Sequence, residues 1–152
     1  MSEKWEASWQ SEKTDWETPP TLFKALDAEF HFTLDAAAQE HNKKVANYYS
    51  PQMNGLIRPW TGVVWCNPPY GKEIGQWVKK GRDSALAGAT VVMLVYARTD
   101  TRWFHDYVYG QAEIRFLRGR VKFVGAESSA PAPSMVIVWR PEVDKSAETV
   151  IE

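Results

Sequence analysis

Cysteine and histidine are scarce in this 152-residue sequence, which contains one Cys and three His. The single cysteine, Cys66, excludes an intrachain disulfide and a zinc site built from several cysteines. The histidines, His31, His41 and His105, show no spacing typical of metal ligands. We therefore expect no metal cofactor.

Long hydrophobic runs are also missing. No stretch approaches the roughly 20 apolar residues that a membrane-spanning helix needs, and residues 1–6 lack the apolar segment of a signal peptide. We therefore expect a cytoplasmic protein without a membrane partner. The composition, 44% hydrophobic and 24% charged, suits one compact domain with its own core.

An overall basic charge is absent, since the net charge is −1. Positive charge is nevertheless concentrated in residues 71–122, which hold 10 Lys/Arg and 5 Asp/Glu. Lys79, Lys80 and Arg82 are typical of a solvated helix face. The cations that lie among loop signals are better candidates for phosphate contacts: Arg98, Arg102, Arg118, Arg120 and Lys122. Surface ion pairs with Asp100, Asp106 or Glu113 are the alternative for the arginines.

Hydrophobic periodicity predicts the order of helices and strands. Helices are expected at 22–30 after two prolines, at 74–87 before Gly88, and at 100–109 with Thr99 or Asp100 as the cap. Strands are expected at 32–35, 62–66, 89–96, 113–117, 121–124 and 134–139, with a further short strand at 45–49. Residues 1–14 are expected to form a flexible arm, 15–142 the domain and 143–152 a tail.

Alternating strands and helices favour an α/β fold, with a mostly parallel sheet and an antiparallel C-terminal portion. Ligands of such sheets bind beyond the carboxyl ends of the strands. Asp35, Asn67 and the loop 97–100 all follow expected strands. We therefore expect the functional site at this edge.

The tetrapeptide Asn67-Pro68-Pro69-Tyr70 is the most informative motif. The prolines fix the backbone and remove two amide donors, which leaves the Asn67 side-chain carbonyl and the Pro68 backbone carbonyl as acceptors. Two converging acceptors suit an amine that donates two hydrogens, and Tyr70 offers a face on which a base can stack. A simple polyproline turn is the alternative. The position directly after a buried strand favours the catalytic interpretation.

The cysteine and four of the tryptophans are expected to have structural roles. Cys66 lies inside the apolar strand run, which favours a buried, inert thiol over a nucleophile. Four tryptophans are expected in the core: Trp65, Trp77, Trp103 and Trp139.

Residues 15–140 resemble the amino-group DNA methyltransferases, and most closely the short phage-type Dam-like adenine methyltransferases. The resemblance implies a Rossmann-like fold, S-adenosylmethionine as cofactor, and methylation of N6 of adenine in duplex DNA after base flipping, in a bacterial host or phage-infected cell. It makes Asn67, Pro68, Pro69 and Tyr70 catalytic. It also implies that the cofactor is bound by Thr18, Pro19, Asp35, Ala36, Ala37 and Asn67.

The sequence departs from this family in its cofactor loop, because residues 35–38 contain no glycine. A ribose-binding acidic residue is not obvious, and Glu40 is a candidate. The same tetrapeptide also occurs in methyltransferases of RNA guanine and of protein glutamine. RNA or protein modification, or an inactive module that binds DNA and cofactor, are therefore the alternative functions.

Overall fold

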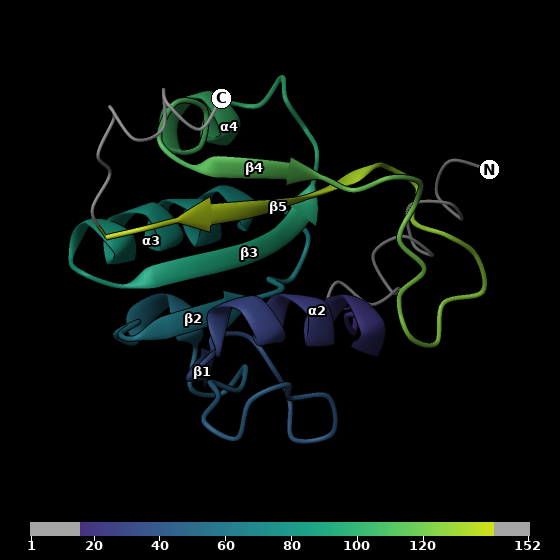
Figure 1. The fold of residues 1–152 in the computed structure, drawn as a ribbon, viewed down its shortest axis with the longest axis horizontal. Helices are drawn as coiled ribbons and strands as arrows, with labels where there is room; N and C mark the ends of the chain where they lie inside the picture. Colours follow the sequence, from purple (N-terminus) through teal and green to yellow (C-terminus); the bar gives the residue numbers. More distant parts are fainter. Residues whose placement is uncertain (1–15, 142–152) are drawn as a thin grey trace.

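One five-stranded sheet with the order β1-β2-β3-β5-β4 forms the centre of the molecule (Figure 1). The computed structural model describes residues 16–141, so the expected arm and tail lie outside the described residues. The strands are β1 (Leu34–Asp35), β2 (Val63–Cys66), β3 (Thr90–Tyr96), β4 (Glu113–Phe116) and β5 (Ser134–Trp139). β1, β2 and β3 are parallel, whereas β5 is antiparallel to both β3 and β4. The expected mixed α/β class is confirmed.

Helices cover both faces of this sheet. They are α2 (Pro20–Phe30), α3 (Ile74–Leu86) and α4 (Arg102–Tyr107), with a short 3-10 helix η1 at Gly55–Ile57. Side chains alternate along a strand, so β3 sends Val91 and Met93 into the core formed with α3 and α4. Its Val92 and Leu94 enter a second core, which includes Phe23 of α2. The apolar run of this strand therefore reflects burial on both faces.

Helix α3 packs closely on the sheet at Gly81. A methyl group there would lie 2.7 Å from the ring of Trp139, so only glycine permits this distance between helix and strand. Trp139 is buried, as are Trp65, Trp77 and Trp103. The prediction of four core tryptophans is confirmed.

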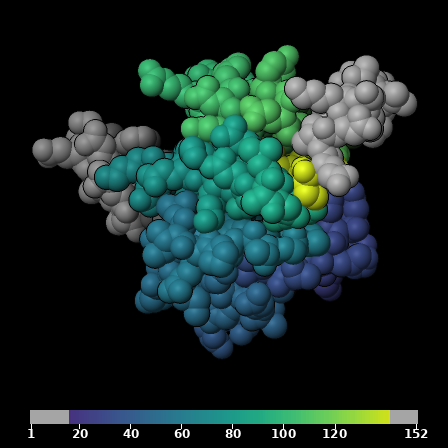
Figure 2. Space-filling view, turned by 90° about the vertical axis from the view of Figure 1, so that its left-hand side faces the viewer, coloured from purple at the N-terminus to yellow at the C-terminus, as the bar shows by residue number. Residues whose placement is uncertain are grey.

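Successive parts of the chain lie one above another in the molecule. Figure 2 shows the side of the molecule at which β5 ends and α3 turns into β3. The segment before β2 (blue) lies at the bottom, the α3–β3 region (teal) in the middle, and the α4–β4 region (green) at the top. No helix within residues 16–141 has the length and apolar character needed to span a membrane.

Three sequence-based expectations were wrong in detail. Residues 121–124 do not form a strand, because their backbone bonds elsewhere: the Val124 amide donates to the Glu17 carbonyl in a single bridge, and the Val121 carbonyl accepts from the Ala130 amide. Helix α4 begins at Arg102 with Thr101 as its cap, since the Thr101 hydroxyl, not that of Thr99, accepts from the Phe104 amide. The expected short strand at 45–49 is reduced to one bridge between Tyr48 and Asp35.

Candidate active site

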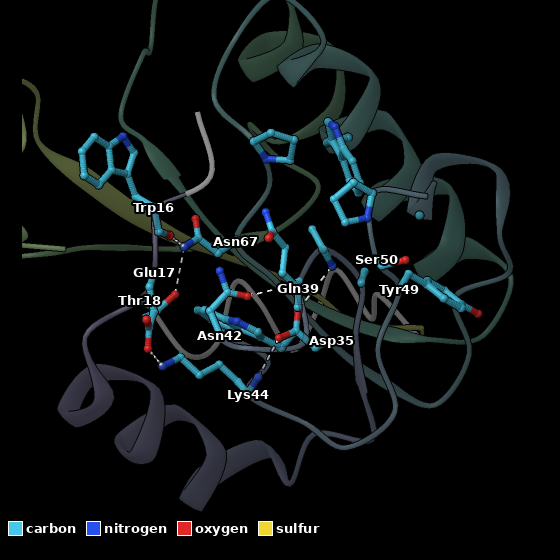
Figure 3. Close-up of a pocket in the computed structure, with 18 of the residues that line it drawn as sticks. Trp16, Glu17, Thr18, Asp35, Gln39, Asn42, Lys44, Tyr49, Ser50 and Asn67 are labelled. Carbon is cyan, nitrogen blue, oxygen red and sulfur yellow. Dashed lines mark hydrogen bonds and ion pairs between the residues drawn. The ribbon is translucent and has the colours of Figure 1, made fainter. Parts of the chain in front are cut away.

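The amide group of Asn67, directly after β2, has one side satisfied and the other unpaired. Its Nδ2 donates to the carbonyl oxygen of Trp16 and to the hydroxyl of Thr18, 3.0 Å away (Figure 3). Its Oδ1 is buried and accepts no hydrogen bond from the residues described, 16–141. An unsatisfied buried acceptor costs about 1–3 kcal/mol, so this oxygen is available for a donor from outside the chain.

A cavity of about 500 Å³ lies at the carboxyl ends of β1 and β2. It brings together five of the six residues expected to bind cofactor: Thr18, Asp35, Ala36, Ala37 and Asn67. Pro19 is not among its lining residues, whereas Pro69 is. Asp35 and Asn67 thus lie around one cavity, whereas Arg98 of the 97–100 loop lines a different one.

Asp35 is 2% exposed and lines this cavity. Burial raises the pKa of Asp35 to about 6, although hydrogen bonds from the backbone amides of Lys44 and Ala37 lower it. These amides lie 2.9 and 3.3 Å from the carboxylate oxygens. Asp35 thus fixes the start of the loop that follows β1 and presents an acidic group to the cavity.

Several residues that line the cavity were not predicted from the sequence. Glu17 lines it, and its carboxylate accepts from the Lys44 ammonium at 3.0 Å. Asn42 also lines it, and its side chain accepts from the Gln39 backbone amide at 2.7 Å (Figure 3). These residues come from segments without hydrophobic periodicity, which gave no signal of their position.

The 35–38 loop contains no glycine, but Gly55, the first residue of η1, lies directly against it. A methyl group on Gly55 would lie 2.2 Å from the carbonyl oxygen of Ala36, so the two segments approach backbone to backbone. Both residues line the cavity. The Glu40 candidate is different, because its exposed carboxylate accepts from the Tyr48 hydroxyl at 2.6 Å and is not part of the lining.

A second cavity, of about 870 Å³, lies at the Tyr70 end of the Asn67–Tyr70 segment. Tyr70 lines it, with its hydroxyl donating to the Leu94 carbonyl at 3.1 Å. Burial of that hydroxyl raises the pKa of Tyr70 well above its usual value. The Tyr70 ring centroid lies 4.5 Å from that of Tyr96 and 6.1 Å from that of Phe123. Trp16 lines both cavities, so it forms part of the wall between them.

The five cations expected to contact DNA are all exposed. Across residues 16–141, none of them takes part in an ion pair. Glu113 pairs instead with Arg115 and Arg140, at 2.6 and 2.7 Å. Arg98 lines the second cavity and lies over the ring of Tyr96, and Arg120 donates to the Ala130 carbonyl at 3.5 Å.

Cys66 is fully buried and lines neither cavity. Burial raises the pKa of its thiol well above the usual value, so the thiol is protonated at neutral pH. The geometry therefore offers no activated nucleophile at this position, in agreement with the expected structural role.

Comparison with known proteins places this chain in a family. The chain is 32% identical over 142 residues to the DNA N-6-adenine-methyltransferase of Haemophilus phage HP1, covering 88% of this chain and 82% of that protein. It is 35% identical over 102 residues to the DNA N-6-adenine-methyltransferase of Escherichia phage T1, of which it spans 42%. A putative methyltransferase of Escherichia coli is 33% identical over 63 residues. A family model described as DNA N-6-adenine-methyltransferase (Dam) matches residues 7–151, and the chain therefore belongs to this family.

Proposed function

We propose that this protein transfers a methyl group from S-adenosylmethionine to the exocyclic N6 amine of adenine in duplex DNA. The cofactor is assigned to the first cavity, which Asn67 lines, and the ring of the extruded base to the second. The base amine would then meet Asn67 beside Trp16, which lines both cavities and bonds to the Asn67 amide. The observation that best supports this proposal is the buried, unpaired Oδ1 of Asn67, an acceptor that suits an amine donor. The family membership of the chain supports the same reaction.

The first cavity fits the cofactor in size and charge. Its volume of about 500 Å³ is within the usual range for small-molecule sites, and it lies beyond the carboxyl ends of parallel strands, as in Rossmann-like folds. Its lining holds three carboxylates, those of Glu17, Asp35 and Glu73, and one ammonium group, that of Lys44, which pairs with Glu17. The excess of acidic groups suits a cationic ligand. When bound, S-adenosylmethionine would supply a methyl group on a positively charged sulfur. The amine lone pair would attack the methyl carbon, the carbon–sulfur bond would break to leave a neutral thioether, and the methylated amine would release one proton to solvent.

Asn67 and Pro68 prepare the amine for this reaction. The amine nitrogen of adenine is conjugated with its ring and is a poor nucleophile. Hydrogen bonds accepted by Asn67 Oδ1 and by the Pro68 carbonyl draw it toward a tetrahedral geometry and uncover its lone pair. Pro68 and Pro69 have no N–H groups that compete for these acceptors. Catalysis then depends on proximity and orientation within a desolvated site.

The second cavity fits an extruded base. Tyr70, Tyr96 and Phe123 form an aromatic cluster beside it, which suits stacking with a flipped base. Base extrusion costs a few kcal/mol, which stacking and phosphate contacts offset. The exposed, unpaired cations supply those contacts: Arg98, Arg102, Arg118, Arg120 and Lys122.

The decisive experiment supplies labelled S-adenosylmethionine together with duplex DNA, RNA or protein, followed by nucleoside analysis of the DNA. We expect label in DNA only, as N6-methyladenine, and at least about tenfold slower labelling with Asn67→Ala. Label in RNA or protein favours those alternative substrates, and the absence of label in all three favours an inactive binding module.

A further inference from the structure

The orientation of the Asn67 amide is fixed within the protein itself. The Trp16 carbonyl can only accept hydrogen bonds, so the side of the amide that faces it must be the NH2 group. A rotation by half a turn would place Oδ1 against this carbonyl. The same rotation would give the substrate amine a donor in place of an acceptor. The activity proposed above therefore depends on a single orientation of this side chain.

We propose that Thr18 is a positioning residue that holds Asn67 in its reactive orientation. The Thr18 hydroxyl accepts the second hydrogen of the Asn67 amide at 3.0 Å, across 49 residues of sequence. Thr18 is only 2% exposed, so water does not compete for this bond. The inference rests on the proposed function and assigns to Thr18 a role toward Asn67 instead of, or in addition to, a cofactor contact.

The segment that contains Thr18 is anchored on both sides. After it, Pro19 accepts the backbone hydrogen bond of Phe23 at 3.1 Å, at the start of α2. Before it, the Glu17 carbonyl accepts from the Val124 amide at 3.0 Å, and its carboxylate pairs with Lys44. Both acceptors of the Asn67 amide are thereby held in place before any substrate arrives.

The test compares the single-turnover methylation rate, at saturating cofactor, of wild type, Thr18→Val and Thr18→Ser. Valine removes the hydroxyl at almost unchanged volume, whereas serine keeps it. We expect Thr18→Val to lower the rate about tenfold and to change the cofactor Kd, measured by calorimetry, by less than about twofold. Thr18→Ser should restore the rate to within about threefold of wild type.

A double-mutant cycle with Asn67→Ala isolates the coupling between the two residues. If Thr18 acts through Asn67, then Thr18→Val combined with Asn67→Ala should be no slower than Asn67→Ala alone, within about twofold. Thr33→Val is the matched control for loss of a hydroxyl, because Thr33 bonds to the Val63 backbone and lines neither cavity.

The possible failures are distinguishable. A weaker cofactor Kd with an unchanged rate at saturation would make Thr18 a cofactor contact and overturn the positioning role. Multiplicative losses in the double variant would also overturn it. An unchanged rate in Asn67→Ala would instead overturn the proposed function. If Thr18→Val melts below the assay temperature, Thr18→Ala and Thr18→Cys, which also lack the hydroxyl, are compared with Thr18→Ser instead.

Discussion

The carboxylate of Asp35 accepts a hydrogen bond from the backbone amide of Lys44 at 2.9 Å, while the ammonium group of Lys44 pairs with Glu17. Lys44 therefore fixes Asp35 through its backbone, and within residues 16–141 the buried carboxylate has no direct ionic partner. This relationship explains why the pKa of Asp35 is raised, because two amide dipoles only partly offset the cost of burial.

The first prediction concerns stability against pH. Asp35 has a pKa of about 6 in the folded protein and 3.8 as its ordinary value, so the folded state binds the proton more tightly. The favourable contribution of protonated Asp35 is complete below pH 3.8 and is lost as pH rises through 6. Because asparagine does not titrate, only the wild type should lose this contribution, up to about 3 kcal/mol of unfolding free energy, between pH 4 and pH 7. The stability of Asp35→Asn relative to wild type should therefore rise by that amount over the same range. A constant difference in urea unfolding across this range would contradict the assignment.

The second prediction concerns cofactor affinity. Asp35→Ala should weaken S-adenosylmethionine binding at least about tenfold in calorimetry, because the cavity loses a carboxylate beside a cationic ligand. Glu40→Ala is the matched control, since Glu40 is an acidic residue of the same loop that lies outside the cavity. Equal Kd values for the two variants would show that Asp35 has a structural role alone.

The third prediction separates the ring of Tyr70 from its hydroxyl. Tyr70→Phe loses only the bond to the Leu94 carbonyl, so its turnover should stay within about threefold of wild type. Tyr70→Ala loses the stacking surface in the second cavity, and its turnover on DNA should fall at least about tenfold. If the alanine variant is as active as the phenylalanine variant, base stacking on Tyr70 is excluded.

The fourth prediction concerns the exposed cations. Phosphate contacts release counterions, so Arg102→Ala and Arg120→Ala should each flatten the slope of log affinity for DNA against log salt by roughly one unit. Arg140→Ala is the control, because Arg140 pairs with Glu113 at 2.7 Å. Slopes that match the control in both variants would place the DNA-binding surface elsewhere.

The fifth prediction compares two glycines of the same helix, α3. A methyl group on Gly81 would lie 2.7 Å from the Trp139 ring, whereas one on Gly75 would make ordinary contact at 3.6 Å with Trp103. Gly81→Ala should therefore destabilise the protein by about 1–2 kcal/mol, and Gly75→Ala should stabilise it by a few tenths to about 1 kcal/mol. Changes of the same sign in thermal unfolding would contradict this packing argument.

Local sequence patterns were sufficient for the elements whose form depends on neighbours along the chain. The central strand β3 and the helix α3 were predicted within a residue or two, because their apolar spacing and the stop at Gly88 are local signals. The assignment of 121–124 as a strand failed because it depends on tertiary contacts. Its β-rich composition is real, yet its backbone bonds to Glu17 and Ala130 and not to β4.

The candidate site was likewise predictable only where its residues follow strands. Asp35 and Asn67 follow strands, and the rule for ligands of α/β sheets placed them at one edge. The roles of Glu17, Lys44 and Gly55 were not predictable, because they reach the cavity through loops whose paths are set by tertiary contacts. The orientation of Asn67 likewise depends on Trp16 and Thr18, which no local pattern connects to it.

The position of β5 has a consequence for folding during synthesis. This strand is the last of the described elements in sequence, yet it lies inside the sheet between β3 and β4. A nascent chain that ends before Ser134 contains β4 without β5, its one partner strand within residues 16–141, and one edge of β3 remains unpaired. During synthesis, the apolar strand β3 therefore leaves the ribosome well before β5, the strand that pairs with its open edge. The five-stranded sheet is complete only after Trp139 has emerged.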